Sequence, residues 1–132
     1  KAFDTVNHDH ILMDLKQKGV DNHIINLIKN MHENIHTCLD SKSEKSEPIH
    51  MWVGVKQGDP MSPLLFKLVI DPLLCKLNDF GKRYKHGKNM VTVMAFADDL
   101  VLFSDSWDGM TTNVVILEAF CELTSLKTQG EK

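Results

Sequence analysis

Apolar side chains recur at helical spacing in the first third of the chain. We expect a helix over residues 8–18, in which Ile11 and Leu15 share an apolar face and Gly19 follows as a stop. Asp21 is a favourable N-cap for a second helix. The apolar positions of that second helix lie three or four residues apart: Ile24, Ile28, Met31 and Ile35.

Two further helices are expected in the second half of the chain. Ser62 and Pro63 indicate a helix start, because a capping hydroxyl precedes a proline at the first helical position. Leucine-rich residues 64–69 continue this helix, and Asp71-Pro72 is expected to kink or restart it. Asp108 can cap a final helix, whose apolar positions are Val114, Leu117, Phe120 and Cys121.

Alternating patterns predict strands between these helices. Residues 37–40 and 49–53 alternate as strands do, on either side of a polar segment over 41–47 that we expect to be a loop or hairpin tip. A basic loop is expected over 81–88, and a β-hairpin follows it. Helices that pack against a small antiparallel sheet define an α+β fold.

The predicted hairpin carries two adjacent carboxylates at its tip, Asp98 and Asp99. Apolar residues run into the tip over 91–96 and out of it over 100–103, so we expect buried flanks and a displayed acidic turn. Two like charges repel unless a cation neutralises them. The pair is therefore a candidate for binding a hard divalent metal. The alternative is a solvated acidic turn.

Composition narrows the class of protein. The 132 residues suffice for one domain with a core, and 42% hydrophobic with 25% charged residues are ordinary globular values. No apolar run approaches the ~20 residues of a membrane span. The three widely separated cysteines suit a reducing compartment. A net charge of −3 is unfavourable for a stand-alone nucleic-acid binder. The compact basic group is Lys82, Arg83, Lys85 and Lys88.

A second informative stretch spans residues 54–63. Gly54 and Gly58 permit close approach of the backbone to another molecule, and Pro60 and Pro63 stiffen the approach to the predicted helix. A free helix N-terminus also favours an anionic partner. The alternative is an ordinary strand-to-helix turn.

Four stretches in this order resemble the motifs of reverse transcriptases. They are Lys-Ala-Phe-Asp-Thr-Val-Asn-His over 1–8, Gly-Val-Lys-Gln-Gly-Asp-Pro-Met-Ser-Pro-Leu-Leu-Phe over 54–66, Phe-Ala-Asp-Asp over 96–99 and a lysine-ended motif over 123–132. The chain resembles the non-LTR retrotransposon group, in particular the site-specific elements of animal genomes. The resemblance covers the whole chain and implies a polymerase palm with part of the fingers.

The resemblance also implies roles for individual residues. Asp98 is the main metal ligand of the hairpin and Asp99 its partner, in two-metal nucleotidyl transfer with Mg²⁺, for which Mn²⁺ is a possible substitute. Lys132 matches a lysine that donates a proton to pyrophosphate.

Four further residues match nucleotide-binding positions: Ala2, Phe3, Gln57 and Gly58. The backbone amides of Ala2 and Phe3 face the triphosphate, and the Phe3 ring excludes a ribose 2′-hydroxyl. The implied partners are an RNA template, a DNA primer and dNTPs, with no membrane.

The same resemblance implies missing parts. The family has another metal-binding aspartate three residues before the lysine that matches Lys1. We therefore expect a fragment truncated at both ends, without the first catalytic strand and the thumb, that is inactive alone. We also expect the parent protein to act inside the cell, in the nucleus.

Other readings of the sequence remain open. One is a retained retrotransposon fragment that acts as a non-catalytic RNA- or protein-interaction module. A structural zinc site is another, because His8 and His10 are two residues apart and His32 and His36 four apart. An Asp-based Mg²⁺ phosphatase would require an α/β alternation that the chain does not show.

Overall fold

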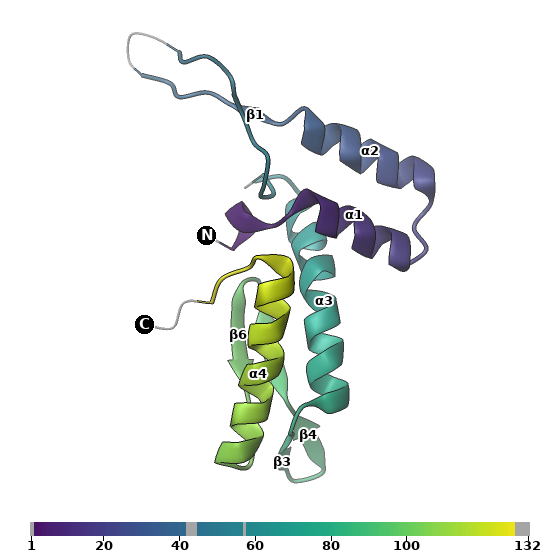
Figure 1. The fold of residues 1–132 in the computed structure, drawn as a ribbon, viewed down its shortest axis with the longest axis vertical. Coiled ribbons are helices and arrows are strands. Elements are labelled where there is room, and N and C mark those ends of the chain that lie inside the picture. The colour runs from purple at the N-terminus through teal and green to yellow at the C-terminus, as the bar shows by residue number, and fades with distance from the viewer. Residues whose placement is uncertain (1, 42–44, 57, 129–132) are drawn as a thin grey trace.

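Figure 1 shows the computed structural model, which describes residues 2–41, 45–56 and 58–128. The described part is α+β, as expected. Its elements are η1 (Phe3–Thr5), α1 (His8–Gln17), α2 (Asn22–Glu33), β1 (His36–Thr37), β2 (Ile49–His50), α3 (Ser62–Phe80), β3 (Tyr84–His86), β4 (Asn89–Val91), β5 (Val93–Phe96), β6 (Asp99–Leu102) and α4 (Trp107–Thr124). None of these helices is long and apolar enough to cross a membrane.

Helix α3 forms the axis of the molecule (Figure 1). Helix α1 packs across its N-terminal half and also contacts α2, while α4 lies along its C-terminal half. Strand β5 contacts α3 as well, so α3 holds the hairpin β5–β6 in place. The β1–β2 arm projects away from these helices.

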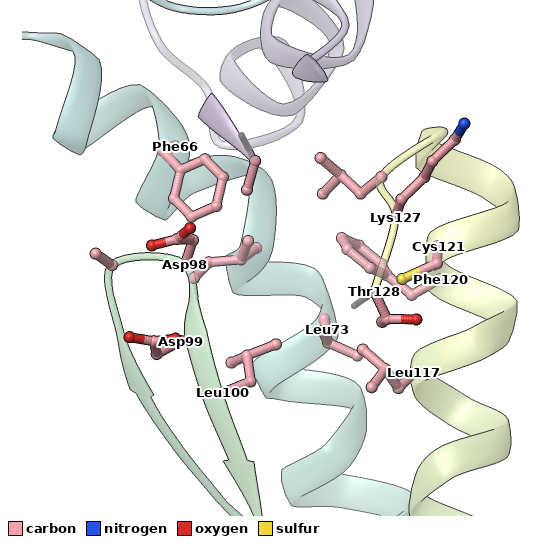
Figure 2. Close-up of a pocket in the computed structure, with 14 residues that line it drawn as sticks. Phe66, Leu73, Asp98, Asp99, Leu100, Leu117, Phe120, Cys121, Lys127 and Thr128 are labelled. Carbon is pink, nitrogen blue, oxygen red and sulfur yellow. The ribbon is translucent and has the colours of Figure 1, made fainter. Parts of the chain in front are cut away.

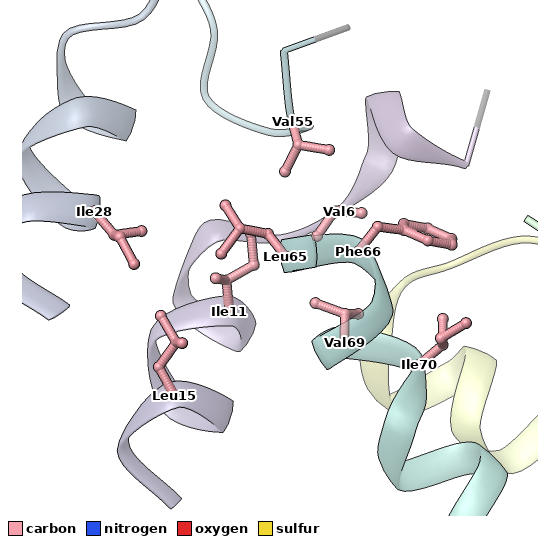
Figure 3. Close-up of a cluster of buried hydrophobic side chains, with 9 residues drawn as sticks. All are labelled: Val6, Ile11, Leu15, Ile28, Val55, Leu65, Phe66, Val69 and Ile70. Atoms are coloured by element: carbon pink, nitrogen blue, oxygen red, sulfur yellow. The ribbon is translucent and has the colours of Figure 1, made fainter. Parts of the chain in front are cut away.

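The main core lies where α1 meets the N-terminal half of α3 (Figure 3). Its buried side chains come from both helices, from α2 and from the segments that precede α1 and α3: Val6, Ile11, Leu15, Ile28, Val55, Leu65, Phe66, Val69 and Ile70. Burial of such side chains supplies the main favourable term in folding, at roughly 25 cal/mol per Å² of apolar surface.

The first two helices confirm the sequence prediction. Helix α1 ends one residue before the expected bound, with Lys18 as its C-cap, and Gly19 follows with a φ of +74°. The Asp21 side chain caps α2 by accepting a hydrogen bond from the His23 N–H at 2.7 Å. Helix α2 ends at Glu33, so the expected apolar position Ile35 lies outside it.

The start of helix α3 at Ser62-Pro63 confirms the prediction, whereas its capping and its course past Pro72 differ from it. The helix begins at Ser62, whose hydroxyl donates to the Lys56 carbonyl at 2.6 Å and caps nothing, while Asp59 Oδ1 accepts from the Met61 N–H at 2.8 Å. The expected restart at Pro72 is wrong, because one helix runs through this residue. Pro72 removes one helical N–H, but buried apolar side chains on both sides of it hold α3 against its neighbours: Val69, Ile70, Leu73 and Leu77.

The described strands form three separate antiparallel pairs rather than one small sheet. Strands β1 and β2 are shorter than expected, with two residues each. The expected loop over 81–88 is wrong in part, because β3 lies within it and pairs with β4 around Gly87, which has a φ of +60°. The predicted cap of the last helix is also wrong. The Ser106 hydroxyl caps α4 by accepting from the Gly109 N–H at 3.1 Å, and Asp108 lies in the first turn.

Candidate active site

The hairpin β5–β6 displays Asp98 and Asp99, as the sequence predicts. Phe96 pairs with Asp99, so Ala97 and Asp98 form a two-residue turn. Ala97 has a φ of +51°, in the left-handed region that disfavours residues with a Cβ. Both aspartates are exposed. The local backbone therefore places one carboxylate in the turn and the next at the start of β6.

The expected burial of both hairpin flanks is wrong for one face. Met94, Phe96 and Val101 are 62%, 83% and 53% exposed. Leu100 and Leu102, which point to the opposite face, are half-buried. Side chains alternate between the two faces of a strand, and in the described structure this two-stranded sheet is covered only on the face toward the helices. The apolar run therefore marks the hairpin but overstates its burial.

A cavity of about 360 Å³ lies beside the acidic turn (Figure 2). Asp98 and Asp99 line it, and Ala2 contributes from the N-terminal segment. Its apolar wall comes from α3 and α4: Phe66, Ile70, Leu73, Leu117 and Phe120. The cavity thus combines two hard oxygen ligands with a largely apolar wall, an arrangement typical of binding sites that orient a substrate with few polar groups.

Phe3 joins this cavity to a second one of about 450 Å³. The second cavity is lined by Phe3, Gly58 and residues at the start of α3. The rings of Phe3 and Phe66 stack with centroids 4.4 Å apart and planes inclined by 15°. Because Phe66 also lines the cavity beside Asp98, the two predicted groups of site residues meet at this aromatic pair. Phe66 is the site residue that pattern reasoning missed, since one buried aromatic residue in a motif is indistinguishable from core.

Gly54 fixes the position of Phe3. Its N–H donates to the Val6 carbonyl at 2.8 Å, and the Val55 N–H donates to the Phe3 carbonyl at 2.8 Å. Gly54 has a φ of +90°, and a Cβ there would lie 2.9 Å from the Asp4 carbonyl oxygen. The predicted close approach is therefore to the chain's own backbone. Gly58 has a φ of +86°, and a Cβ added there would meet no atom of the described residues within 4 Å. The backbone at Gly58 is therefore open to close approach by another molecule.

The carboxylate pair suits magnesium in ligand type and exposure. Mg²⁺ binds through one or two carboxylates together with water and substrate phosphates. Asp98 and Asp99 both line the open cavity, and Asp99 shares its strand face with Phe96. Within residues 2–41, 45–56 and 58–128, no group of three or more His, Cys, Asp or Glu side chains forms a metal cluster. Gln57 and Lys132, the remaining predicted site residues, lie outside the described residues.

Cys121 also lines the cavity beside Asp98. Burial raises the pKa of its thiol, and the nearby negative charge of Glu118 raises it further. The thiol is therefore protonated at neutral pH and contributes polarisable packing surface rather than a thiolate nucleophile.

The histidines considered for zinc make other contacts in the structure. His8 stacks on His32, with ring centroids 4.3 Å apart, and its Nε2 donates to the Gly54 carbonyl at 2.7 Å. His36 lies beyond the end of α2 and faces His50 instead. The helical spacing of His32 and His36 does not create a shared face, because α2 ends between them.

The profile of the family "Reverse transcriptase (RNA-dependent DNA polymerase)" matches residues 1–132. The chain belongs to the reverse transcriptase family. The resemblance of its motifs to the reverse transcriptases of non-LTR retrotransposons is thereby confirmed.

Three proteins similar to the chain come from animal transposable elements. The chain is 35% identical over 134 residues to the "Retrovirus-related Pol polyprotein from type-1 retrotransposable element R2" of Popillia japonica, covering 100% of the chain and 19% of the relative. It is 36% identical over 133 residues to the corresponding "type-2 retrotransposable element R2DM" protein of Drosophila melanogaster, covering 100% and 12%. It is 30% identical over 134 residues to the "Transposon TX1 uncharacterized 149 kDa protein" of Xenopus laevis, covering 100% and 10%. The chain thus spans less than a fifth of each of these relatives.

Proposed function

We propose that this chain forms the catalytic hairpin and nucleotide-binding surface of an RNA-directed DNA polymerase encoded by a retrotransposon, within its palm and part of its fingers. The observation that carries the proposal is the convergence of predicted site residues from distant parts of the chain. Asp98, Asp99 and Ala2 line one cavity, Phe3 and Gly58 line the next, and the Phe3–Phe66 stack joins them.

Asp98 and Asp99 would hold the divalent cations, with Mg²⁺ as the physiological ion and Mn²⁺ as its substitute. When bound, such cations lower the pKa of an attacking hydroxyl and stabilise charge on transferring phosphates. The contribution of the chain is positional. The turn that begins at Ala97 holds both carboxylates at the rim of a cavity with a rigid apolar wall, where a primer 3′-end and a nucleotide triphosphate are brought together.

Phe3 would select the sugar of the incoming nucleotide. Its ring is held by stacking on Phe66 and its carbonyl by the Val55 N–H, so it yields little to a bulkier substrate. A ribose carries one more hydroxyl than a deoxyribose, and a fixed aromatic edge excludes that volume. The amides of Ala2 and Phe3 would face the triphosphate, with Gln57 and Gly58 beside nucleotide and template and Lys132 as proton donor to pyrophosphate.

Primer extension tests this function. Residues 1–132 replace the matched segment of the Popillia japonica R2 protein, and the chimera receives an RNA template, a DNA primer, dNTPs and Mg²⁺. We expect extension that is lost in Asp98→Asn and in Asp99→Asn and kept in the matched control Asp105→Asn, an exposed aspartate outside the hairpin. A natively folded chimera that extends no primer would contradict the proposal.

The same assay on the isolated 132 residues addresses the alternative function. We expect no extension, because Asp98 and Asp99 are only part of the carboxylate set that the family resemblance implies. Template RNA binding without extension, in both the isolated chain and the chimera, would favour a non-catalytic RNA-interaction module. Robust extension by the isolated chain that Asp98→Asn abolishes would overturn the expectation that it is inactive alone.

The proposed site of action of the parent protein is the nucleus.

A further inference from the structure

The β1–β2 arm carries a row of three aromatic rings, which we call the aromatic row: His36, His50 and Trp52. His36 and His50 are directly paired across the two strands, and their ring centroids lie 5.0 Å apart. His50 and Trp52 lie 4.1 Å apart, with planes inclined by 71°. Directly paired residues and residues two positions apart point to the same side of a strand, which explains why the three rings meet.

The rings of the aromatic row contact one another, with His36 and Trp52 exposed to solvent and His50 half-buried. Edge-to-face contacts fix the ring orientations, and aromatic side chains have few rotatable bonds to immobilise on binding. Trp52 is nevertheless 78% exposed, although an indole gains more than most side chains from burial. A large apolar ring that is held in place but left uncovered is typical of surfaces that stack on a flat partner.

Charge favours stacking as the mode of binding. Between β1 and Lys56, the described charged residues are two acidic and two basic: Asp40, Glu47, Lys45 and Lys56. The arm therefore neither attracts nor repels a polyanion strongly. Aromatic rings stack on any nucleobase, and this contribution does not depend on neutralising phosphates.

The aromatic row continues into the proposed nucleotide site. Val53 follows Trp52 and forms a bridge with Asn7, and Gly54 and Val55 then bond to the backbone beside Phe3. A strand of nucleic acid that passes Phe3 and Gly58 thus finds Trp52 on the same short segment of chain. Single-stranded bases expose the faces that stacking requires, whereas bases within a duplex already stack on one another.

We propose that His36, His50 and Trp52 form a stacking platform for unpaired bases of the template RNA. This inference rests on the proposed function for the identity of the nucleic acid, while binding itself requires no catalysis. Trp52 stacks on a base, and His50 and His36 extend the platform across the arm.

The experiment uses tryptophan fluorescence, because the chain contains only Trp52 and Trp107. In the Trp107→Phe chain, Trp52 is the sole reporter, and a single-stranded 12-nucleotide RNA is expected to quench it saturably. Replacing Trp52 by Ala should weaken RNA binding by about fivefold to a hundredfold in fluorescence anisotropy, since stacking on one base contributes ~1–3 kcal/mol. Trp52→Phe should retain most of the affinity, and the affinity should change little between low and moderate salt.

Trp107→Ala is the matched control, because Trp107 is 83% exposed but lies at the start of α4. It should bind RNA as the unaltered chain does. Equal binding by Trp52→Ala and the unaltered chain would overturn the platform, as would equal losses in both alanine variants. Loss of self-association in Trp52→Ala, without any RNA quenching, would assign the row to a protein interface instead. RNA binding is measured without primer, dNTPs or Mg²⁺, so failure of the platform and failure of the polymerase proposal are distinguishable.

Discussion

The side chain of Asn113 and the backbone of Lys82 exchange two hydrogen bonds. The Lys82 N–H donates to Asn113 Oδ1 at 2.7 Å, and Asn113 Nδ2 donates to the Lys82 carbonyl at 2.9 Å. The same Nδ2 donates to the Phe103 carbonyl at 3.0 Å, and Asn113 is fully buried. One amide on α4 thus ties together the segment after α3 and the end of β6, the strand that begins with Asp99.

Replacing Asn113 by Ala should lower the free energy of unfolding by about 3 kcal/mol. The change removes three hydrogen bonds to the backbone groups of Lys82 and Phe103, each of which contributes roughly 0.5–1.5 kcal/mol. Urea unfolding followed by circular dichroism measures the loss. The exposed Asn78 on α3 is the control, and Asn78→Ala should change stability by less than about 0.5 kcal/mol. Similar losses of unfolding free energy in both variants would show that Asn113 does not hold these segments together.

Gly54 should tolerate alanine far less well than Gly87 does. Both have positive φ, +90° and +60°, so both variants pay ~1–2 kcal/mol for a left-handed alanine. Only at Gly54 does the new Cβ meet backbone, 2.9 Å from the Asp4 carbonyl oxygen, and this contact should cost at least about 2 kcal/mol more. Thermal unfolding of the two variants measures the difference. Equal melting temperatures of the two variants would show that the backbone at Gly54 shifts freely away from Asp4.

Local signals made much of this fold predictable. Asp21 caps α2, Gly19 follows α1 and apolar runs mark the hairpin, because each signal acts within a few residues of the element it defines. Pro72 misled the prediction, since its local cost is outweighed by buried neighbours on both sides that pack against other helices. Local helix propensity predicts structure poorly where tertiary contacts determine it.

The candidate site was predictable in its residues but not in its geometry. The motifs named Asp98, Phe3 and Gly58, and the structure brings all three around the N-terminal half of α3. The Phe3–Phe66 stack and the contact of Gly54 with Asp4 join residues about fifty or more positions apart. Such pairings depend on the packed chain, and neither periodicity nor spacing in one sequence encodes them.

Protonation of His32 should destabilise the fold as the pH falls. Burial lowers the pKa of His32 below its ordinary value of 6.5, the positive charge of the stacked His8 lowers it further, and Asp59 opposes both effects. Because the folded state binds this proton less readily than the unfolded state, the stabilisation is complete above pH 6.5 and is lost as the pH falls toward the folded pKa.

Replacing His32 by Gln should therefore flatten the dependence of stability on pH below about 6.5. Urea unfolding at several pH values measures the slope. His23, which is exposed on the same helix, provides the control, and His23→Gln should keep the slope of the unaltered chain. An unchanged slope in His32→Gln would show that other groups cause the acid sensitivity.

Ala97→Gly should leave stability nearly unchanged, although glycine usually weakens a β-hairpin. The φ of +51° at Ala97 costs an alanine roughly 1 kcal/mol, which glycine avoids, and this gain offsets the ~0.5–1 kcal/mol of additional chain entropy that glycine loses on folding. Ala95, within β5 and paired with Leu100, has ordinary strand geometry, so Ala95→Gly should lower stability by about 1 kcal/mol. Equal destabilisation in denaturant unfolding would mean that Ala97 bears no strain. The predicted difference would show that the turn beside Asp98 is held in a conformation that its own residue disfavours, as expected where the surrounding fold fixes the position of the proposed metal-binding carboxylate.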